Sequence, residues 1–218
     1  MQKVFKKIIK YFFARPIIEL AVLCPIHFNI SVMRRLNGIQ LSAEQLQLIT
    51  VSVKRKAPCR LLVFGLGNDS LFWFRLNRGG VTIFLEDSKE WYQKVVKRLK
   101  DLRAFLVNYN TRRDDWKMLL QSPSLLHMSL PNDVENENWD VIIVDGPEGH
   151  NDQTLGRMKS IYLAAQLVKN LGDVFVHDCD REVEDIYANN FLKKENIIME
   201  VKGPMGLLRH YKITNRSS

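Results

Sequence analysis

The sequence predicts an α/β fold in which a seven-stranded, mostly parallel sheet carries helices on both faces. Short apolar segments alternate with amphipathic ones from residue 42 onward, and a turn with two glycines follows the first of these strand-like segments. The chain has 218 residues and 46% hydrophobic content, enough to bury one core without disulfides. This composition excludes disordered, collagen-like and low-complexity proteins.

Residues 1–41 are predicted to form a basic extension. Residues 1–60 contain eleven Lys and Arg against two acidic residues, which leaves 21 basic and 22 acidic residues for the remainder. The net charge of +8 therefore belongs to the N-terminal part, and we expect no nucleic-acid partner. Residues 1–15 show the spacing of an amphipathic basic helix. It either contacts a membrane surface peripherally, packs on the domain, or presents a solvated face.

Neither a transmembrane helix nor a signal peptide is predicted. The longest uncharged run near the N-terminus, residues 20–33, is shorter than the 18 or so residues that a span needs. Charged residues and a proline interrupt any signal-peptide core. We therefore expect a soluble or peripheral protein, cytoplasmic by default. The cysteines are odd in number and widely spaced, which argues against a disulfide framework or a zinc site: Cys24, Cys59 and Cys179.

The predicted domain covers residues 42–218. Its first helix spans residues 42–53, with Ser42 as N-cap. Five buried strands with intervening helices follow, and an antiparallel pair closes the sheet. The predicted strands are residues 60–65, 81–86, 104–109, 139–145, 173–177, 197–201 and 207–213. The remaining predicted helices begin near Ser70, at a capping box formed by Asp87 and Glu90, and at residues 158 and 183.

The turn after the first strand is a candidate cofactor site. Its glycines allow backbone to approach a ligand closely, and Glu86 ends the second strand 21 residues after Gly65, where an acid can accept hydrogen bonds from an adenosine ribose. Ser70 replaces the third glycine of dinucleotide sites, which favours S-adenosylmethionine over NAD. A tight turn without a ligand is the alternative. The predicted cofactor-binding residues are Gly65, Gly67, Asp69, Ser70, Glu86 and, unless it only caps a helix, Asp115.

Polar residues also follow the fourth and fifth strands. Ligands bind outside the carboxyl ends of strands in an open parallel sheet, so we predict that Asp145, His177 and Asp178 share a catalytic cleft. One of them would take a hydroxyl proton as general base. Alternatively, Asp145, Asp178 and Asp180 could supply hard oxygen ligands to Mg²⁺ or Mn²⁺. Some of these residues are expected to be structural, and Asp180 is a candidate helix cap.

Further side chains are candidates for binding an acceptor. A guanidinium fits the carboxylate of an acidic sugar bidentately, although each arginine alone could be a surface charge. The predicted substrate-binding residues are His150, Arg157 and Arg181. A different function, a metal-dependent glycosyltransferase, is suggested by the Asp-Cys-Asp sequence from Asp178 to Asp180.

Several segments resemble motifs of the plant polysaccharide-biosynthesis (xylan) domain family, which includes the glucuronoxylan 4-O-methyltransferases. They are residues 57–70, 76–86, 139–146, 156–162 and 174–184. The resemblance extends from about residue 42 to residue 211. It implies a class I S-adenosylmethionine-dependent methyltransferase that methylates the 4-hydroxyl of glucuronic acid in a cell-wall polysaccharide. The cofactor motif matches at Gly65, Gly67 and Glu86, and the strand-end motifs match at Asp145, His177 and Asp178.

The chain also departs from the family's pattern. Asn68 stands where the family often has His, and the loop after Asp145 is Gly-Pro-Glu-Gly-His in place of Ala-Pro-Thr-Gly-Tyr. Because that loop should shape the acceptor pocket, the acceptor stays open. Plant members commonly carry a Golgi anchor, so a Golgi location would follow only from the family. A non-catalytic scaffold of polysaccharide synthesis is the other alternative.

Overall fold

The computed structural model describes residues 30, 34–35 and 37–214. The amphipathic helix predicted for residues 1–15 lies outside this part of the chain. Within the described residues, no helix is both long and apolar enough to cross a membrane.

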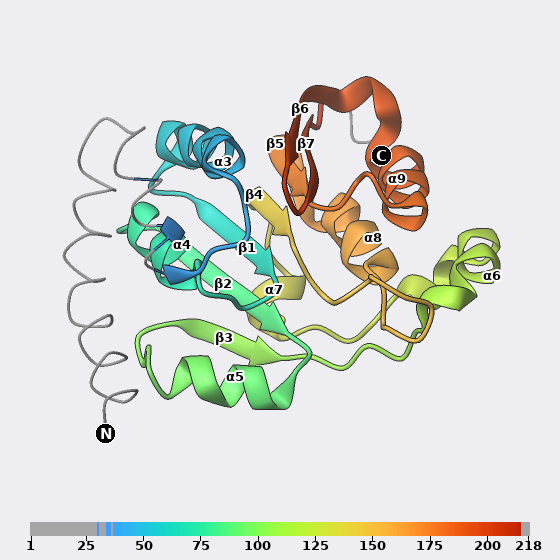
Figure 1. Ribbon diagram of the computed structural model, residues 1–218, viewed down its shortest axis with the longest axis horizontal. Coiled ribbons are helices and arrows are strands. Elements are labelled where there is room, and N and C mark those ends of the chain that lie inside the picture. Colours follow the sequence, from blue (N-terminus) through green and yellow to red (C-terminus); the bar gives the residue numbers. More distant parts are fainter. Residues whose placement is uncertain (1–29, 31–33, 36, 215–218) are drawn as a thin grey trace.

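A single seven-stranded sheet forms the centre of the protein (Figure 1). The strand order is β3-β2-β1-β4-β5-β7-β6, the first five strands are parallel, and β7 runs antiparallel to both of its neighbours. This confirms the predicted mostly parallel sheet with a closing antiparallel pair. The strands are β1 (Arg60–Phe64), β2 (Val81–Glu86), β3 (Arg103–Leu106), β4 (Trp139–Val144), β5 (Val168–Val176), β6 (Ile197–Gly203) and β7 (Gly206–Lys212).

Helices cover both faces of the sheet. One apolar layer packs beneath α3 (Ala43–Lys56), α4 (Ser70–Leu76) and α5 (Lys89–Val96). The opposite layer packs beneath α6 (Trp116–Gln121), α7 (Asn132–Glu135), α8 (Met158–Leu167) and α9 (Glu182–Ala188). Alternate residues of a strand face opposite sides. Leu61 and Val63 of β1 accordingly join the first layer, and Leu62 and Phe64 join the second.

One of the two predicted helix N-caps is confirmed and the other is wrong. Ser42 caps α3 as predicted, in a capping box with Gln45. The box predicted for Asp87 and Glu90 is wrong: α5 begins one residue later, and Ser88 accepts the N–H of Trp91. The N–H of Ser88 itself donates to Glu86, which places Ser88 at the cap.

Two strands differ in length from their predictions. The strand predicted to run to residue 109 ends at Leu106, which pairs with the last residue of β2, and beyond it β3 has no neighbour to continue the ladder. The strand predicted to begin at residue 173 begins at Val168, after an irregular register with β4. The short helices between residues 113 and 135 carry weak periodicity, and apart from the cap suggested before Trp116 they were not predicted.

A buried ion cluster ties α3 to the sheet at the end away from the glycine turn. Asp173 is 0% exposed and contacts the side chains of Lys56 at 2.8 Å, His210 at 2.8 Å and Lys212 at 3.3 Å. Burial alone would raise the pKa of Asp173. Hydrogen bonds from His210 and Lys56 outweigh it, so the pKa falls to about 2. Asp173 is therefore ionised and compensated at neutral pH.

Removing the charge of Asp173 should destabilise the protein. We expect Asp173→Asn to lower the free energy of unfolding by about 3 kcal/mol, because it removes the buried charge that pairs with the partly buried ammonium groups of Lys56 and Lys212. Asp133→Asn breaks an exposed pair with Arg103 and should cost under about 1 kcal/mol. Urea unfolding of both variants at pH 7 tests this, and equal stabilities would contradict it.

Candidate functional site

The turn between β1 and α4 allows an unusually close approach of two loops. Gly65 has a φ of +112°, and a β-carbon at this position would lie 3.3 Å from backbone atoms of Asp145 and Gly146. Only glycine combines this conformation with this contact. The N–H of Gly67 donates to Ser70 Oγ over 2.8 Å. Because Ser70 is fully buried and does not line the cavity described below, it shapes the turn, and its predicted contact with a cofactor is not supported.

Glu86 connects this turn to the end of β2. Its Oε2 accepts the N–H of Leu66 and its Oε1 accepts the N–H of Ser88, each over 2.8 Å. Burial raises the pKa of Glu86. A carboxylate can accept about four hydrogen bonds, so the acid holds the turn and still has acceptor capacity for a ligand. It lines the cavity, as the predicted ribose contact requires.

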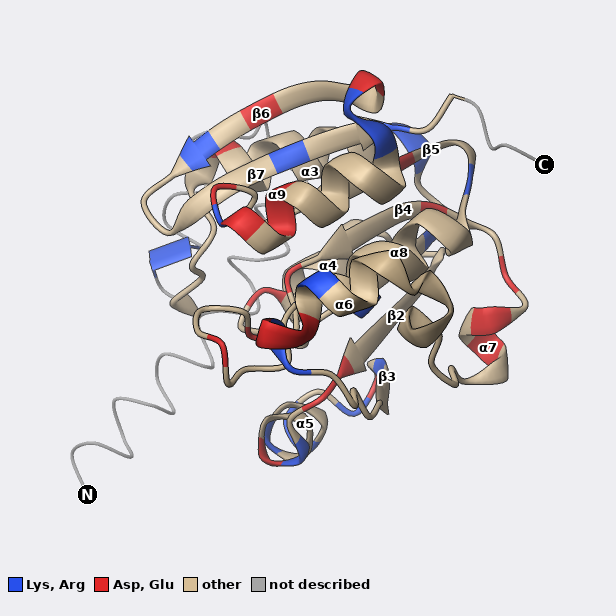
Figure 2. Cartoon of the chain, turned by 90° about the vertical axis from the view of Figure 1, so that its right-hand side faces the viewer, with Lys and Arg blue, Asp and Glu red and all other residues tan. Residues whose placement is uncertain are grey.

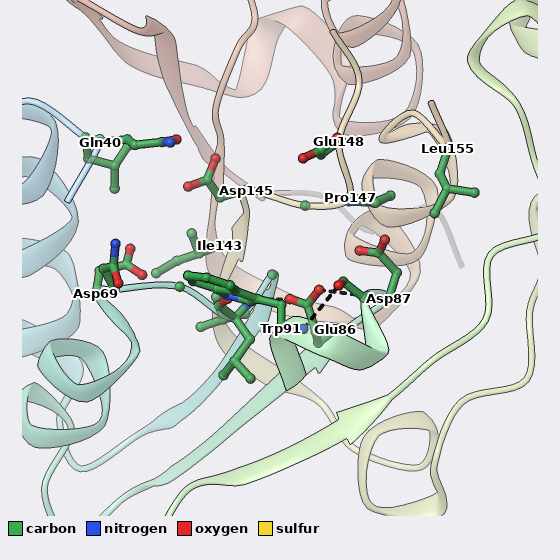
Figure 3. Close-up of a pocket in the computed structure, with 18 of the residues that line it drawn as sticks. Gln40, Asp69, Glu86, Asp87, Trp91, Ile143, Asp145, Pro147, Glu148 and Leu155 are labelled. Carbon is green, nitrogen blue, oxygen red and sulfur yellow. Dashed lines mark hydrogen bonds between the residues drawn. The ribbon is translucent and has the colours of Figure 1, made fainter. Parts of the chain in front are cut away.

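A cavity of about 650 Å³ opens at the carboxyl ends of β1, β2 and β4 (Figure 3). Its volume lies within the range of small-molecule sites. Its walls are residues 38–41, 65–69, 86–88, 145–148 and 153–155, together with Trp91 and side chains of β1 and β4. The sequence predicted that Gly65, Gly67, Asp69 and Glu86 would share one site, and all four line this cavity.

Asp69 is an unusual acid within this cavity. Its carboxylate accepts the indole N–H of Trp73 over 2.8 Å. Burial, and then the negative charge of Asp145, raise the pKa of Asp69 to about 6. The two acids thus influence each other from facing loops.

Two cavity residues were missed by sequence reasoning. Trp91 lies in the first turn of α5, and its indole N–H donates to the carbonyl of Leu66. An aromatic residue soon after the acid that ends β2 was the available signal. Gln40 belongs to a segment assigned to the N-terminal extension, and its side chain points into the cavity (Figure 3). The buried neighbours Ile39 and Leu41 anchor that segment, so the boundary predicted between residues 41 and 42 cuts through the site.

A second cavity of about 240 Å³ adjoins the first. Gln40, Asp145 and Glu148 line both cavities. The remaining walls include the three residues predicted to bind an acceptor and two of those predicted to be catalytic: His150, Arg157, Arg181, His177 and Asp178. The structure therefore brings the polar residues after β4 and β5 together, as the sequence predicted. Asp145 stands between the two cavities.

Arg157 binds the two strand ends to each other. Its guanidinium lies 2.8 Å from Asp178 and 3.3 Å from Asp145, and the side chain is only 6% exposed. It also donates to three backbone carbonyls, those of Asp145, Pro147 and His177. Most of its donors are therefore used inside the protein. Arg157 organises the site, and its predicted role as a substrate ligand is not supported.

His177 is a buried histidine between two acids. Its Nδ1 lies 3.1 Å from Asp145 and 3.4 Å from Asp178, while its buried Nε2 has no hydrogen-bond partner among the described residues. Burial alone would lower the pKa of His177. The hydrogen bonds and charges of Asp145 and Asp178 outweigh it and raise the pKa to about 9. The ring is therefore protonated at neutral pH, which leaves Asp145 as the better proton acceptor.

The remaining predicted residues separate into two groups. Arg181 contacts Asp178 at 3.0 Å with a third of its side chain exposed, and His150 is exposed at the rim of the second cavity. Both can meet a ligand. Asp115 does not line either cavity and accepts the N–H of Arg112 instead, so its predicted contact with adenine is not supported.

The predicted metal site does not fit the structure. Asp145, His177 and Asp178 bring one potential ligand atom each within 4.8 Å of one another. Arg157 contacts both carboxylates, and Arg181 also contacts Asp178, so the two negative charges are already compensated. Asp180, the third predicted ligand, pairs with Lys202 and accepts the N–H of Leu207. The same contacts argue against the glycosyltransferase alternative through Asp178 and Asp180.

The protonation of His177 should appear in the pH dependence of stability. Its folded pKa of about 9 lies above the unfolded value of about 6.5. The stabilisation is therefore complete below pH 6.5 and is lost as the pH rises through 9. It amounts to about 3 kcal/mol. We expect the free energy of unfolding of the wild type, measured in urea, to fall between pH 6.5 and pH 9 relative to that of His177→Gln. If the free energies of the two proteins changed in parallel with pH, the raised pKa of His177 would be refuted.

Residues 44–128 and 121–211 match the profile of the IRX15/IRX15L/GXM family, which covers most of the chain. The chain belongs to this family. Glucuronoxylan 4-O-methyltransferase 2 of Arabidopsis thaliana is 39% identical over 180 residues, which are 73% of this chain and 61% of that protein. Arabinogalactan O-methyltransferase 2 of the same plant is 36% identical over 204 residues, or 82% and 69% of the two chains. The chain thus spans about three-fifths to two-thirds of these relatives.

The fold agrees with a solved methyltransferase-type structure. A Staphylococcus aureus protein provisionally named caffeoyl-CoA O-methyltransferase superposes with a TM-score of 0.56 and 13% identity. The match covers 92% of this chain and 99% of that one. Together with the sheet order, this confirms the predicted class I methyltransferase fold.

Proposed function

We propose that the protein transfers a methyl group from S-adenosylmethionine to a sugar hydroxyl, and that its acceptor is the 4-hydroxyl of a glucuronic acid in a polysaccharide. The observation that carries the proposal is Asp145, whose position between the two cavities would place it beside both methyl donor and acceptor. Membership of the IRX15/IRX15L/GXM family and the names of the relatives support the same chemistry.

The larger cavity suits the donor. Bound there, S-adenosylmethionine would supply a methyl group on a sulfonium, which is already a good leaving group. Glu86 retains acceptor capacity for ribose hydroxyls, and the ring of Trp91 provides an aromatic wall for adenine. Among the described residues, those that line this cavity include no Lys, Arg or His of the kind a pyrophosphate would need. Its charged side chains are all acidic: Asp69, Glu86, Asp87, Asp145 and Glu148.

The smaller cavity suits an acidic sugar. The exposed part of Arg181 and the protonated ring of His177 would attract a uronic carboxylate, and His150 lies at the rim. Asp145 would accept the proton of the attacking hydroxyl. Methyl transfer also needs an in-line arrangement of hydroxyl oxygen, methyl carbon and sulfur, so holding the acceptor beside the donor adds to the acceleration from the base.

The relatives' names offer two acceptors, a glucuronoxylan and an arabinogalactan. We place glucuronoxylan first because the arginine and histidine in the second cavity favour a carboxylate-bearing sugar. Parallel assays with glucuronic-acid-bearing xylo-oligosaccharides and with arabinogalactan fragments distinguish them. Donor binding without turnover of either acceptor would instead favour the non-catalytic scaffold.

Donor binding is tested by calorimetric titration with S-adenosylhomocysteine. We expect wild-type protein to bind with a micromolar Kd and Trp91→Leu to bind about tenfold more weakly, because one stacking face is lost. Tyr92→Leu changes a neighbouring aromatic residue of α5 outside the cavity and should leave the Kd unchanged. Folded wild-type protein that does not bind would overturn the proposal.

The role of Asp145 is tested by Asp145→Asn. Loss of a general base should lower kcat by about 10²- to 10⁴-fold, while the Kd for S-adenosylhomocysteine should change less than the kcat. Asp101→Asn removes an exposed acid far from both cavities and serves as the control. A kcat near that of the wild type would exclude Asp145 as the base.

A further inference from the structure

Glu184 is a buried acid that the proposed chemistry does not use. It lies in the first turn of α9, whose acidic start is visible in Figure 2, and it is 0% exposed. Neither carboxylate oxygen has a hydrogen-bond partner among the described residues. Burial raises the pKa of Glu184, although the positive charges of Arg157, Arg181 and Arg113 oppose that rise. Burying a carboxyl group without hydrogen bonds is costly, so such a group calls for a physical explanation.

The carboxylate of Glu184 faces the loop that follows β4. A β-carbon on Gly149 would lie 2.4 Å from Glu184 Oε1, so the carboxylate would have to move if any other residue stood there. We call residues 146–156 the acceptor loop, because Glu148, Gly149 and His150 line the second cavity. Glu184 thus contacts the acceptor loop without lining either cavity.

The acceptor loop also meets a second unsatisfied group. Arg113 holds the far part of the loop through its ion pair with Asp152 and its backbone bond to Thr154. Its Nε is buried without a partner among the described residues. An acceptor on α9 and a donor on Arg113 therefore border the same loop with unused hydrogen-bonding capacity. A modest shift of the loop could supply their partners.

We propose that Glu184 is a positioning residue for the acceptor loop: its carboxylate receives backbone N–H groups around Gly149 when an acceptor fills the second cavity, which holds Glu148 and His150 against the sugar. This inference rests on the proposed function. Hydrogen bonds to a carboxylate are about twice as strong as neutral ones, so the free protein keeps a strong acceptor ready for the occupied state.

A purely structural role predicts different behaviour. Replacing an unpaired buried acid with an apolar side chain of similar size should leave the fold as stable or more stable. If Glu184 only fills space, Glu184→Leu would therefore leave acceptor turnover unchanged. If it positions the loop, the same variant would be stable, would bind donor normally, and would use the acceptor poorly.

The test compares hydrogen–deuterium exchange of residues 146–156 with S-adenosylhomocysteine alone and with S-adenosylhomocysteine plus a glucuronic-acid-bearing xylo-oligosaccharide, because part of this loop also lines the larger cavity. We expect the oligosaccharide to slow exchange about tenfold in the wild type, but not in Glu184→Leu. Glu184→Gln keeps one acceptor oxygen and should be intermediate. Glu182→Gln, an exposed acid on the same turn, should match the wild type.

Kinetics supply the second readout. Glu184→Leu should lower kcat/KM for the oligosaccharide about tenfold, with the Kd for S-adenosylhomocysteine and the Tm not reduced. The inference would be overturned if Glu184→Leu showed the same loop protection and the same kcat/KM as the wild type. It would also be overturned if the wild type bound S-adenosylhomocysteine but its loop exchanged at the same rate with and without the oligosaccharide. If Glu184→Leu does not fold, Glu184→Gln decides. A wild type that binds no S-adenosylhomocysteine overturns the proposed function and the inference with it.

Discussion

The guanidinium of Arg157 holds the carboxyl end of the sheet in its working shape. It joins the ends of β4 and β5 through Asp145, Asp178 and three carbonyls, while almost no solvent reaches it. Without this buried cation, Asp145 would keep only His177 as a positively charged contact among the described residues, and no side chain would join Asp145 and Asp178 to the carbonyls of the two loops. The position of Asp145 between the two cavities and the shape of the second cavity depend on it. The raised pKa of His177 comes from the two acids that Arg157 holds beside it, Asp145 and Asp178.

The two cavities share the loop that follows β4 and differ in their other walls. The larger one is built from glycine turns and from Glu86, whose two backbone bonds connect adjacent strand ends. The smaller one is bounded on one side by the acceptor loop. This loop contacts Arg113 and, at Gly149, Glu184, and each of these two side chains has buried polar atoms without a hydrogen-bond partner among the described residues. Residues 146–148 and 153–155 of the acceptor loop also line the larger cavity, so a change of sequence in this loop would alter the walls of both cavities.

Local sequence patterns predicted most of the fold and about half of the site. Alternating apolar segments located all seven strands, and strand ends located the clustering of Asp145, His177 and Asp178. Asp115 and Ser70 failed because position near a strand end does not say whether a side chain points into a cavity. Gln40 was missed because it comes from a segment that packs across the site from outside the recognised motif.

By itself, the sequence determined the sheet, the glycine turn, the acid at the end of β2 and the family, because each depends on residues close together in the chain. Tertiary structure decided which charges are paired. Whether an arginine binds substrate or braces two loops, and whether a histidine is a base or an imidazolium, depends on groups 12 to 32 residues away, such as Arg157 beside Asp145 and His177 beside Asp145. Tertiary structure also buries Glu184. The residues next to it in the sequence do not show that its carboxylate oxygens lack a hydrogen-bond partner among the described residues.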